Sequence, residues 1–61
     1  MTPADREALR SIERLLVHVA CVGIDPTAPD DAYETPRIRC GDVRDARRAY
    51  HVVERLIREG A

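Results

Sequence analysis

Apolar residues recur every three or four positions over the first third of the chain, which is the spacing that gathers them on one side of an α-helix. Thr2, Pro3 and Asp5 precede this pattern in the order of a helix start: a capping hydroxyl, a proline in the first turn and an acid three residues after the cap. We therefore predict a helix over residues 3–22, ended by Gly23. Its apolar positions are Ala8, Leu9, Ile12, Leu15, Leu16, Val19 and Val22.

A second pattern with the same period fills the last third of the chain. Asp42, with Asp45 three residues later and Gly41 just before it, is typical of a helix start, and Gly60 ends the pattern. The sequence predicts a helix over residues 42–59. Its apolar side carries Ala46, Ala49, Tyr50, Val53, Leu56 and Ile57.

The connection between these helices, from Ile24 to Gly41, contains three prolines. Within it, residues 28–34 follow the same capping logic and predict one short helical turn, whereas residues 37–40 alternate polar and apolar like a short strand. A connection of this length is unusual in a compact hairpin, so we expect it to be partly ordered and to pack against the helices.

The predicted fold is all-α: an antiparallel hairpin of two helices, forming a single small domain over residues 1–61. A chain of 61 residues without Phe or Trp builds little core, and domains of this size usually need a disulfide, a metal or a partner subunit. We therefore expect a helical-bundle dimer. The candidate core or oligomer face comprises Leu9, Ile12, Leu16, Val19, Val53, Leu56 and Ile57.

The charged residues are unevenly distributed along the chain. Residues 1–35 hold three Arg and seven acids, whereas residues 36–61 hold seven Arg and four acids, so the two parts carry charges of −4 and +3 and attract each other. All ten basic residues are Arg and none is Lys, which indicates a GC-rich genome such as that of an actinobacterium or its phage.

Basic side chains line the side of the second helix that lies opposite its apolar positions. Two interpretations remain open: a solvated face neutralised by neighbours such as Asp45, Glu54 and Glu59, which we favour, or a surface that binds phosphates or an acidic protein groove. We call these residues, with two from the connection, the Arg ridge: Arg37, Arg39, Arg44, Arg47, Arg48, His51, Arg55 and Arg58.

Two cysteines flank the connection. Cys21 and Cys40 come together if the helices are antiparallel, but a reducing cytoplasm favours free thiols over a disulfide. A metal site built from His18, Cys21 and Cys40 is a weaker interpretation because no Cys-x-x-Cys pair is present, and no cofactor is expected. Cys21 and Val17 lie off the main apolar stripe, so we expect something to cover them. We favour the connection, through Tyr33 or Ile38, over a second subunit or a client protein.

Motifs for catalysis are absent from the sequence, which has no glycine-rich phosphate loop, no metal-binding His motif and a single serine. Neither a membrane-spanning run nor a secretion signal is visible, so the expected location is cytoplasmic, without a membrane partner. The leading hypothesis is a non-enzymatic protein–protein interaction or regulatory module that associates with itself, as a homodimer or higher oligomer, and with another protein. The alternative is a nucleic-acid-binding regulator that uses the Arg ridge.

Overall fold

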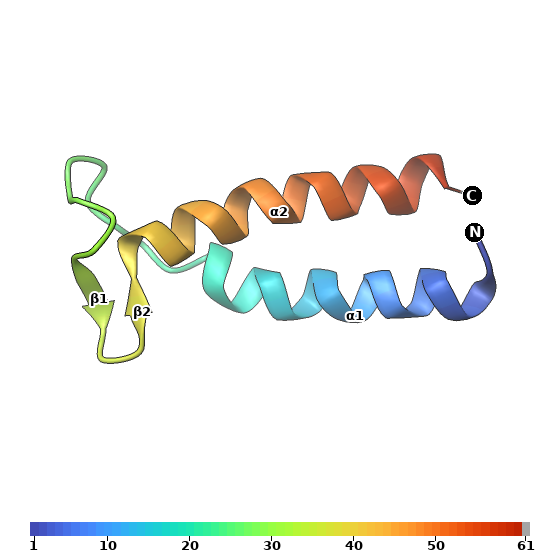
Figure 1. Cartoon of the computed structure of the whole chain (residues 1–61), viewed down its shortest axis with the longest axis horizontal. Coiled ribbons are helices and arrows are strands. Elements are labelled where there is room, and N and C mark those ends of the chain that lie inside the picture. Colours follow the sequence, from blue (N-terminus) through green and yellow to red (C-terminus); the bar gives the residue numbers. More distant parts are fainter. Residues whose placement is uncertain (61) are drawn as a thin grey trace.

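Two long helices lie antiparallel and side by side, with a small β-hairpin at one end and both chain termini at the other (Figure 1). The structure, a computed structural model, describes residues 1–60. Along the chain the elements are α1 (Pro3–Ala20), β1 (Tyr33–Thr35), β2 (Ile38–Arg39) and α2 (Cys40–Glu59). The predicted helical hairpin is confirmed, but the prediction of an all-α fold is wrong because β1 and β2 form an antiparallel sheet.

Helix α1 starts as the sequence predicts and ends slightly earlier. The Thr2 hydroxyl accepts a hydrogen bond from the Asp5 N–H at 3.1 Å and so caps the first turn. At the other end Cys21 is the C-cap, and its N–H donates to the Val17 carbonyl at 3.0 Å. Gly23 is not a left-handed helix stop, since no glycine among residues 1–60 has positive φ.

Helix α2 starts at Cys40, two residues before the predicted start, and ends at Glu59 as predicted. Asp42 is not the residue before the helix but lies in its first turn, where its carboxylate accepts a hydrogen bond from the Arg39 N–H at 3.1 Å. An acid in this turn also interacts favourably with the positive end of the helix dipole. Asp42 therefore stabilises the start of α2 from inside its first turn.

The connection folds into turns and the β-hairpin. Ala28 and Ala32 donate their N–H groups to the Asp25 and Pro29 carbonyls, and no helix forms over the predicted range 28–34. The chain instead extends at β1, because the Thr35 hydroxyl accepts the Ile38 N–H at 3.1 Å and closes a turn onto β2. The strand predicted within residues 37–40 is thus confirmed for its middle residues.

The connection touches the first turn of α2 at Gly41. Its N–H donates to the Asp30 carbonyl at 2.9 Å, and a Cβ on this glycine would lie 2.9 Å from the Asp30 Cβ and 3.0 Å from its carbonyl oxygen. Both atoms belong to Asp30, whose carbonyl accepts this hydrogen bond, so the backbone there is held in place. Only glycine permits this close approach of the two segments.

We expect Gly41→Ala to lower the free energy of unfolding by about 1–3 kcal/mol, since the added methyl group forces the connection away from α2. Urea denaturation followed by circular dichroism measures the change. Gly23→Ala is the matched control, because nothing lies within 4 Å of its Cβ and its φ is not positive. Equal stability losses in both variants would contradict the proposed close approach.

The buried core is thin and lies on one helix. Its residues all belong to α2, and no residue of α1 is fully buried. Of the predicted core or oligomer face, Ile57 is buried, Leu9, Leu16, Val19 and Val53 are half-buried, and Ile12 and Leu56 are exposed. The core comprises Cys40, Val43, Ala46 and Ile57.

Neither helix of the described residues is long and apolar enough to cross a membrane.

Candidate functional site

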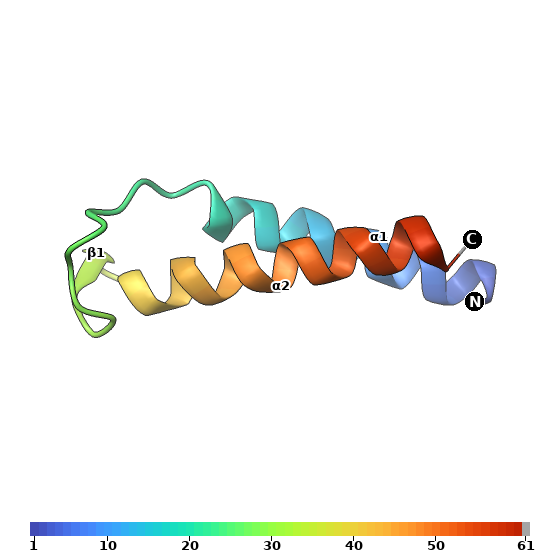
Figure 2. The ribbon, with the colours of Figure 1, turned by 90° about the horizontal axis from the view of Figure 1, so that it is seen from above.

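The hairpin is a flat body with two broad faces. Its Cα atoms span 39 × 19 × 14 Å, and the two helices lie next to each other in the plane of Figure 1. Turned by 90°, the molecule is somewhat thinner and the helices cross at a shallow angle (Figure 2). Each helix therefore exposes side chains on both broad faces, and nothing else in residues 1–60 forms a second layer over them.

One broad face is apolar. Leu16 of α1 and Ile57 of α2 each lie on the side of their own helix that faces the other helix. Each residue turns a helix by about 100°, so the exposed apolar residues of both helices then point to the same broad side. Four of them are large and exposed: Ile12 (44%), Leu15 (68%), Val52 (45%) and Leu56 (44%). With the smaller side chains between them, this apolar face comprises Ala8, Ile12, Leu15, Val19, Ala49, Val52 and Leu56.

The total exposed surface also indicates an uncovered face. The accessible surface is 4514 Å² for a chain of 6.9 kDa. A typical folded monomer of this mass exposes roughly 4,000 Å². Exposed apolar side chains are common singly, but contiguous patches that cross two elements mark interaction surfaces.

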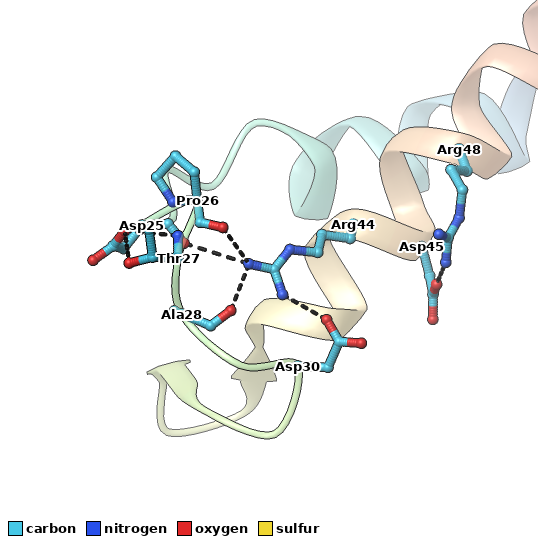
Figure 3. A network of polar contacts seen from close by, with 8 residues as sticks. All are labelled: Asp25, Pro26, Thr27, Ala28, Asp30, Arg44, Asp45 and Arg48. Carbon is cyan, nitrogen blue, oxygen red and sulfur yellow. Dashed lines mark hydrogen bonds and ion pairs between the residues drawn. The ribbon is translucent and has the colours of Figure 1, made fainter.

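The central residue of the Arg ridge, Arg44, is used to hold the connection. Its guanidinium pairs with the Asp30 carboxylate at 2.5 Å and donates to the Ala28 carbonyl at 2.6 Å, with longer contacts to the carbonyls of Asp25 and Pro26 (Figure 3). The Asp25 carboxylate in turn accepts the N–H and hydroxyl of Thr27, and these hydrogen bonds lower the pKa of Asp25. The planar fork of Arg suits this role because several acceptors converge on it.

Arg47 is a second structural residue of the ridge. Its guanidinium donates to the Ala20 and Val22 carbonyls, both at 2.9 Å, and so satisfies acceptors at the C-terminal end of α1. A positive charge there also interacts favourably with the helix dipole. This contact explains how α1 ends without a left-handed glycine.

The other ridge residues are divided among separate surroundings. Arg48 pairs with the neighbouring Asp45, and both side chains are largely exposed. Arg39 donates to the Tyr33 hydroxyl at 2.8 Å and lies 5.0 Å from the centre of that ring. The remaining members are exposed without an ion pair among the described residues: Arg37, His51, Arg55 and Arg58. Within the ridge, Arg44, Arg47, Arg48 and Arg39 are thus engaged by other groups of the chain, whereas the remaining members are exposed.

We expect Arg44→Gln to destabilise the connection by about 1–3 kcal/mol, because it leaves the Asp30 carboxylate and the Ala28 carbonyl without their partner. Amide hydrogen exchange should speed up at residues 28–32 and at Gly41. The control is Arg48→Gln, whose exposed pair with Asp45 is expected to contribute less than about 1 kcal/mol. Unchanged exchange in the Arg44 variant would contradict this role.

The second broad face is basic and draws on both helices. At about 100° per residue, three arginines of α1 spaced four residues apart turn to the side opposite Leu15, together with two from α2. The arginines of α1 are not among the predicted binding residues, which come from α2 and the connection only; their four-residue spacing was the available signal. This basic face comprises Arg6, Arg10, Arg14, Arg47 and Arg58.

A shallow apolar hollow opens on the basic face. It has a volume of about 260 Å³ and is lined by Val17, Ala20 and Cys21 of α1 and by Tyr50 of α2. The expectation that the connection covers Val17 and Cys21 is wrong, since Val17 is 40% exposed and Tyr33 of the connection is itself 58% exposed. The physical reason is that the connection is anchored by Arg44 and at Gly41 to the first turns of α2, which project beyond the end of α1 (Figure 1).

Tyr50 forms the floor of the hollow on the α2 side. Its ring packs edge to face on that of His51, with 5.8 Å between the ring centres. A hydrogen bond to the Glu54 carboxylate, and then the negative charge of that group, raise the pKa of the Tyr50 hydroxyl, with smaller contributions from burial and Glu13. Tyr50 therefore stays neutral at physiological pH.

The two cysteines lie in different surroundings and are unpaired. Cys40 is buried in the core, whereas Cys21 is exposed and its thiol donates to the Val17 carbonyl at 2.6 Å. The weakly predicted metal set of these cysteines and His18 is not brought together. Within residues 1–60, no cluster of three or more His, Cys, Asp or Glu residues has a geometry that could hold a metal ion.

The candidate sites are thus two opposed surfaces on one thin hairpin. The apolar face exposes large aliphatic side chains, and the basic face carries five arginines and a shallow hollow. Comparison of the chain with protein-family models, with curated proteins and with solved structures found no match.

Proposed function

We propose that this protein is a non-enzymatic interaction module that forms a homodimer through its apolar face. The observation that carries the proposal is the row of exposed large side chains, led by Leu15, that crosses both helices on one side. Two hairpins that meet through such faces give a four-helix arrangement, which is a common way to bury the stripes of short amphipathic helices.

The make-up of the face supports a second copy as its occupant. The apolar residues run from Ala8 to Val19, roughly 17 Å along α1, and continue onto α2 from Ala49 to Leu56. A two-fold dimer also uses the same patch on both subunits, so one apolar face per chain is enough to form it. Residues such as Ile12 and Leu56 then move from solvent into a shared core.

The thin core of one hairpin supports the same proposal. Four buried residues are few for a stable domain, and a second subunit covers apolar surface that the chain cannot cover alone. Folding and association are then linked, so stability rises with protein concentration.

Light scattering coupled to size-exclusion chromatography tests the proposal, together with thermal melts over protein concentrations from about 1 to about 200 μM. We expect a mass twice the 6.9 kDa of one chain and a melting temperature that rises with concentration. A monomer over the whole range, with a constant melting temperature, would refute the dimer.

The alternative function, nucleic-acid binding through the Arg ridge, has less support. Arg44 and Arg47 donate to carbonyl groups of the chain itself, so they are not free for phosphates without loss of those contacts. Absorbance at 260 nm in the same chromatography tests it, because Tyr33 and Tyr50 are the only aromatic residues besides histidine and absorb weakly. An excess at 260 nm that disappears at high salt would favour this alternative.

A further inference from the structure

We propose that the basic face binds an acidic segment of a partner protein, and that one large apolar side chain of this segment enters the hollow between Val17 and Tyr50. The proposal rests on the proposed function as an interaction module and names the chemistry of its partner. It uses the broad face opposite to the one proposed for the dimer, so each contact is testable without the other.

The charge of the face supports an acidic partner. The ion pairs among residues 1–60 are those of Arg44 and Arg48, so no arginine of the basic face is paired there. Three carboxylates lie on the same side: Glu7, three residues before Arg10, and Glu13 and Glu54, whose negative charges both act on the Tyr50 hydroxyl. Five arginines and three glutamates give this face a net charge of +2, and Arg47 among them also donates hydrogen bonds to the Ala20 and Val22 carbonyls. Complementary charge both steers a partner and sets its register.

The hollow distinguishes a protein segment from a phosphate backbone. Phosphate binding needs only positive charge and hydrogen-bond donors, whereas the walls of the hollow are apolar groups of Val17, Ala20 and Cys21. A volume of about 260 Å³ has room for one large apolar side chain. Buried anchors of this type, surrounded by a polar rim, carry most of the affinity in many protein interfaces.

The position of the basic face also gives the dimer a mode of action. Since the apolar and basic faces lie on opposite broad sides, a dimer joined through the former leaves both basic faces on its outer surfaces. Such a dimer binds two acidic segments at once. If both belong to one target, the second contact forms at high effective concentration and strengthens the whole complex.

A synthetic peptide tests the proposal by fluorescence anisotropy. The probe is a labelled peptide of about 15 residues, rich in Glu, with a single central Leu, and its partner probe has Ala in place of that Leu. We expect saturable binding of the Leu peptide and at least about tenfold weaker binding of the Ala peptide. The full-length protein is used throughout.

Variants of the protein locate the binding surface. Arg14→Glu and Val17→Glu are each expected to weaken binding of the Leu peptide at least about tenfold, because they reverse the charge beside the hollow and block the hollow itself. Arg37→Glu is the matched control: it reverses an exposed arginine outside the basic face and should change the affinity less than about twofold. Helical circular dichroism and the dimer mass verify that each variant is folded, and Val17→Gln replaces Val17→Glu if it is not.

Four outcomes of the binding experiments would overturn the proposal. These are no binding of the Leu peptide, equal binding of the Ala peptide, an equal loss in the Arg37 variant, and tighter binding of a DNA duplex that Val17→Glu leaves unchanged. Self-association lost in Arg14→Glu but kept in Leu15→Glu would assign the face to a second copy and would likewise overturn it. Failure of the dimer alone, with peptide binding intact, would refute only the proposed homodimer.

Discussion

Leu15→Glu is expected to convert the dimer into a monomer. Leu15 is the most exposed large apolar residue of the described chain, so glutamate costs little in one hairpin but places a charge in the proposed interface. Burial of a leucine contributes about 1.5–3 kcal/mol, and each dimer contains two. The dissociation constant should therefore rise at least about 100-fold, measured by sedimentation equilibrium.

The control for this prediction is Val17→Glu, which introduces the same charge at an exposed apolar position of the same helix on the opposite face. We expect it to keep the dimer and to lose binding of the acidic peptide, whereas Leu15→Glu shows the reverse pattern. If both variants dissociate equally, or if neither does, the dimer does not use the apolar face.

The second large effect is expected in the core. Val43 is completely buried, and Val43→Ala should lower the free energy of unfolding by about 2 kcal/mol, because it removes buried apolar groups and leaves a cavity. Small scaffolds rarely have more than about 3–5 kcal/mol in total. The variant should thus be partly unfolded at room temperature when the protein is dilute.

Urea denaturation at one fixed protein concentration measures this effect, since self-association makes the stability of each variant depend on concentration. Val17→Ala is the matched control because it makes the same substitution at an exposed helical position. We expect a change below about 0.5 kcal/mol there. Equal losses at both positions would mean that Val43 does not belong to the core that holds the helices together.

The role of the arginines illustrates why charge patterns on one helix are difficult to interpret alone. Arg44 and Arg47 lie on the side of α2 that the sequence analysis treated as a surface, yet their side chains reach carbonyl groups of the connection and of α1. An arginine is long enough to extend from an exposed Cα to a neighbouring segment. Assigning it to binding or to structure therefore requires the position of that segment.

The sequence by itself determined the two helices, their approximate ends and their apolar sides. This was possible because helical periodicity and the caps at Thr2 and near Asp42 are local properties, set by residues three or four apart. The short strand over Ile38–Arg39 was also readable from local alternation. No helix forms over residues 28–34, because the local capping signal is overridden by two sets of contacts. The Asp30 and Ala32 carbonyls accept hydrogen bonds from the start of α2, and residues 33–35 pair with β2.

Only the tertiary structure decided what the remaining residues do. Whether Arg44 holds the connection, whether Gly41 must be glycine and whether Leu15 stays exposed all depend on which segments lie side by side, and such contacts join residues that are far apart in the chain. The basic face arises in the same way, since it forms when Arg14 of one helix and Arg47 of the other turn to one side. Periodicity sets how residues are arranged around each helix, but only packing sets which side of each helix is covered.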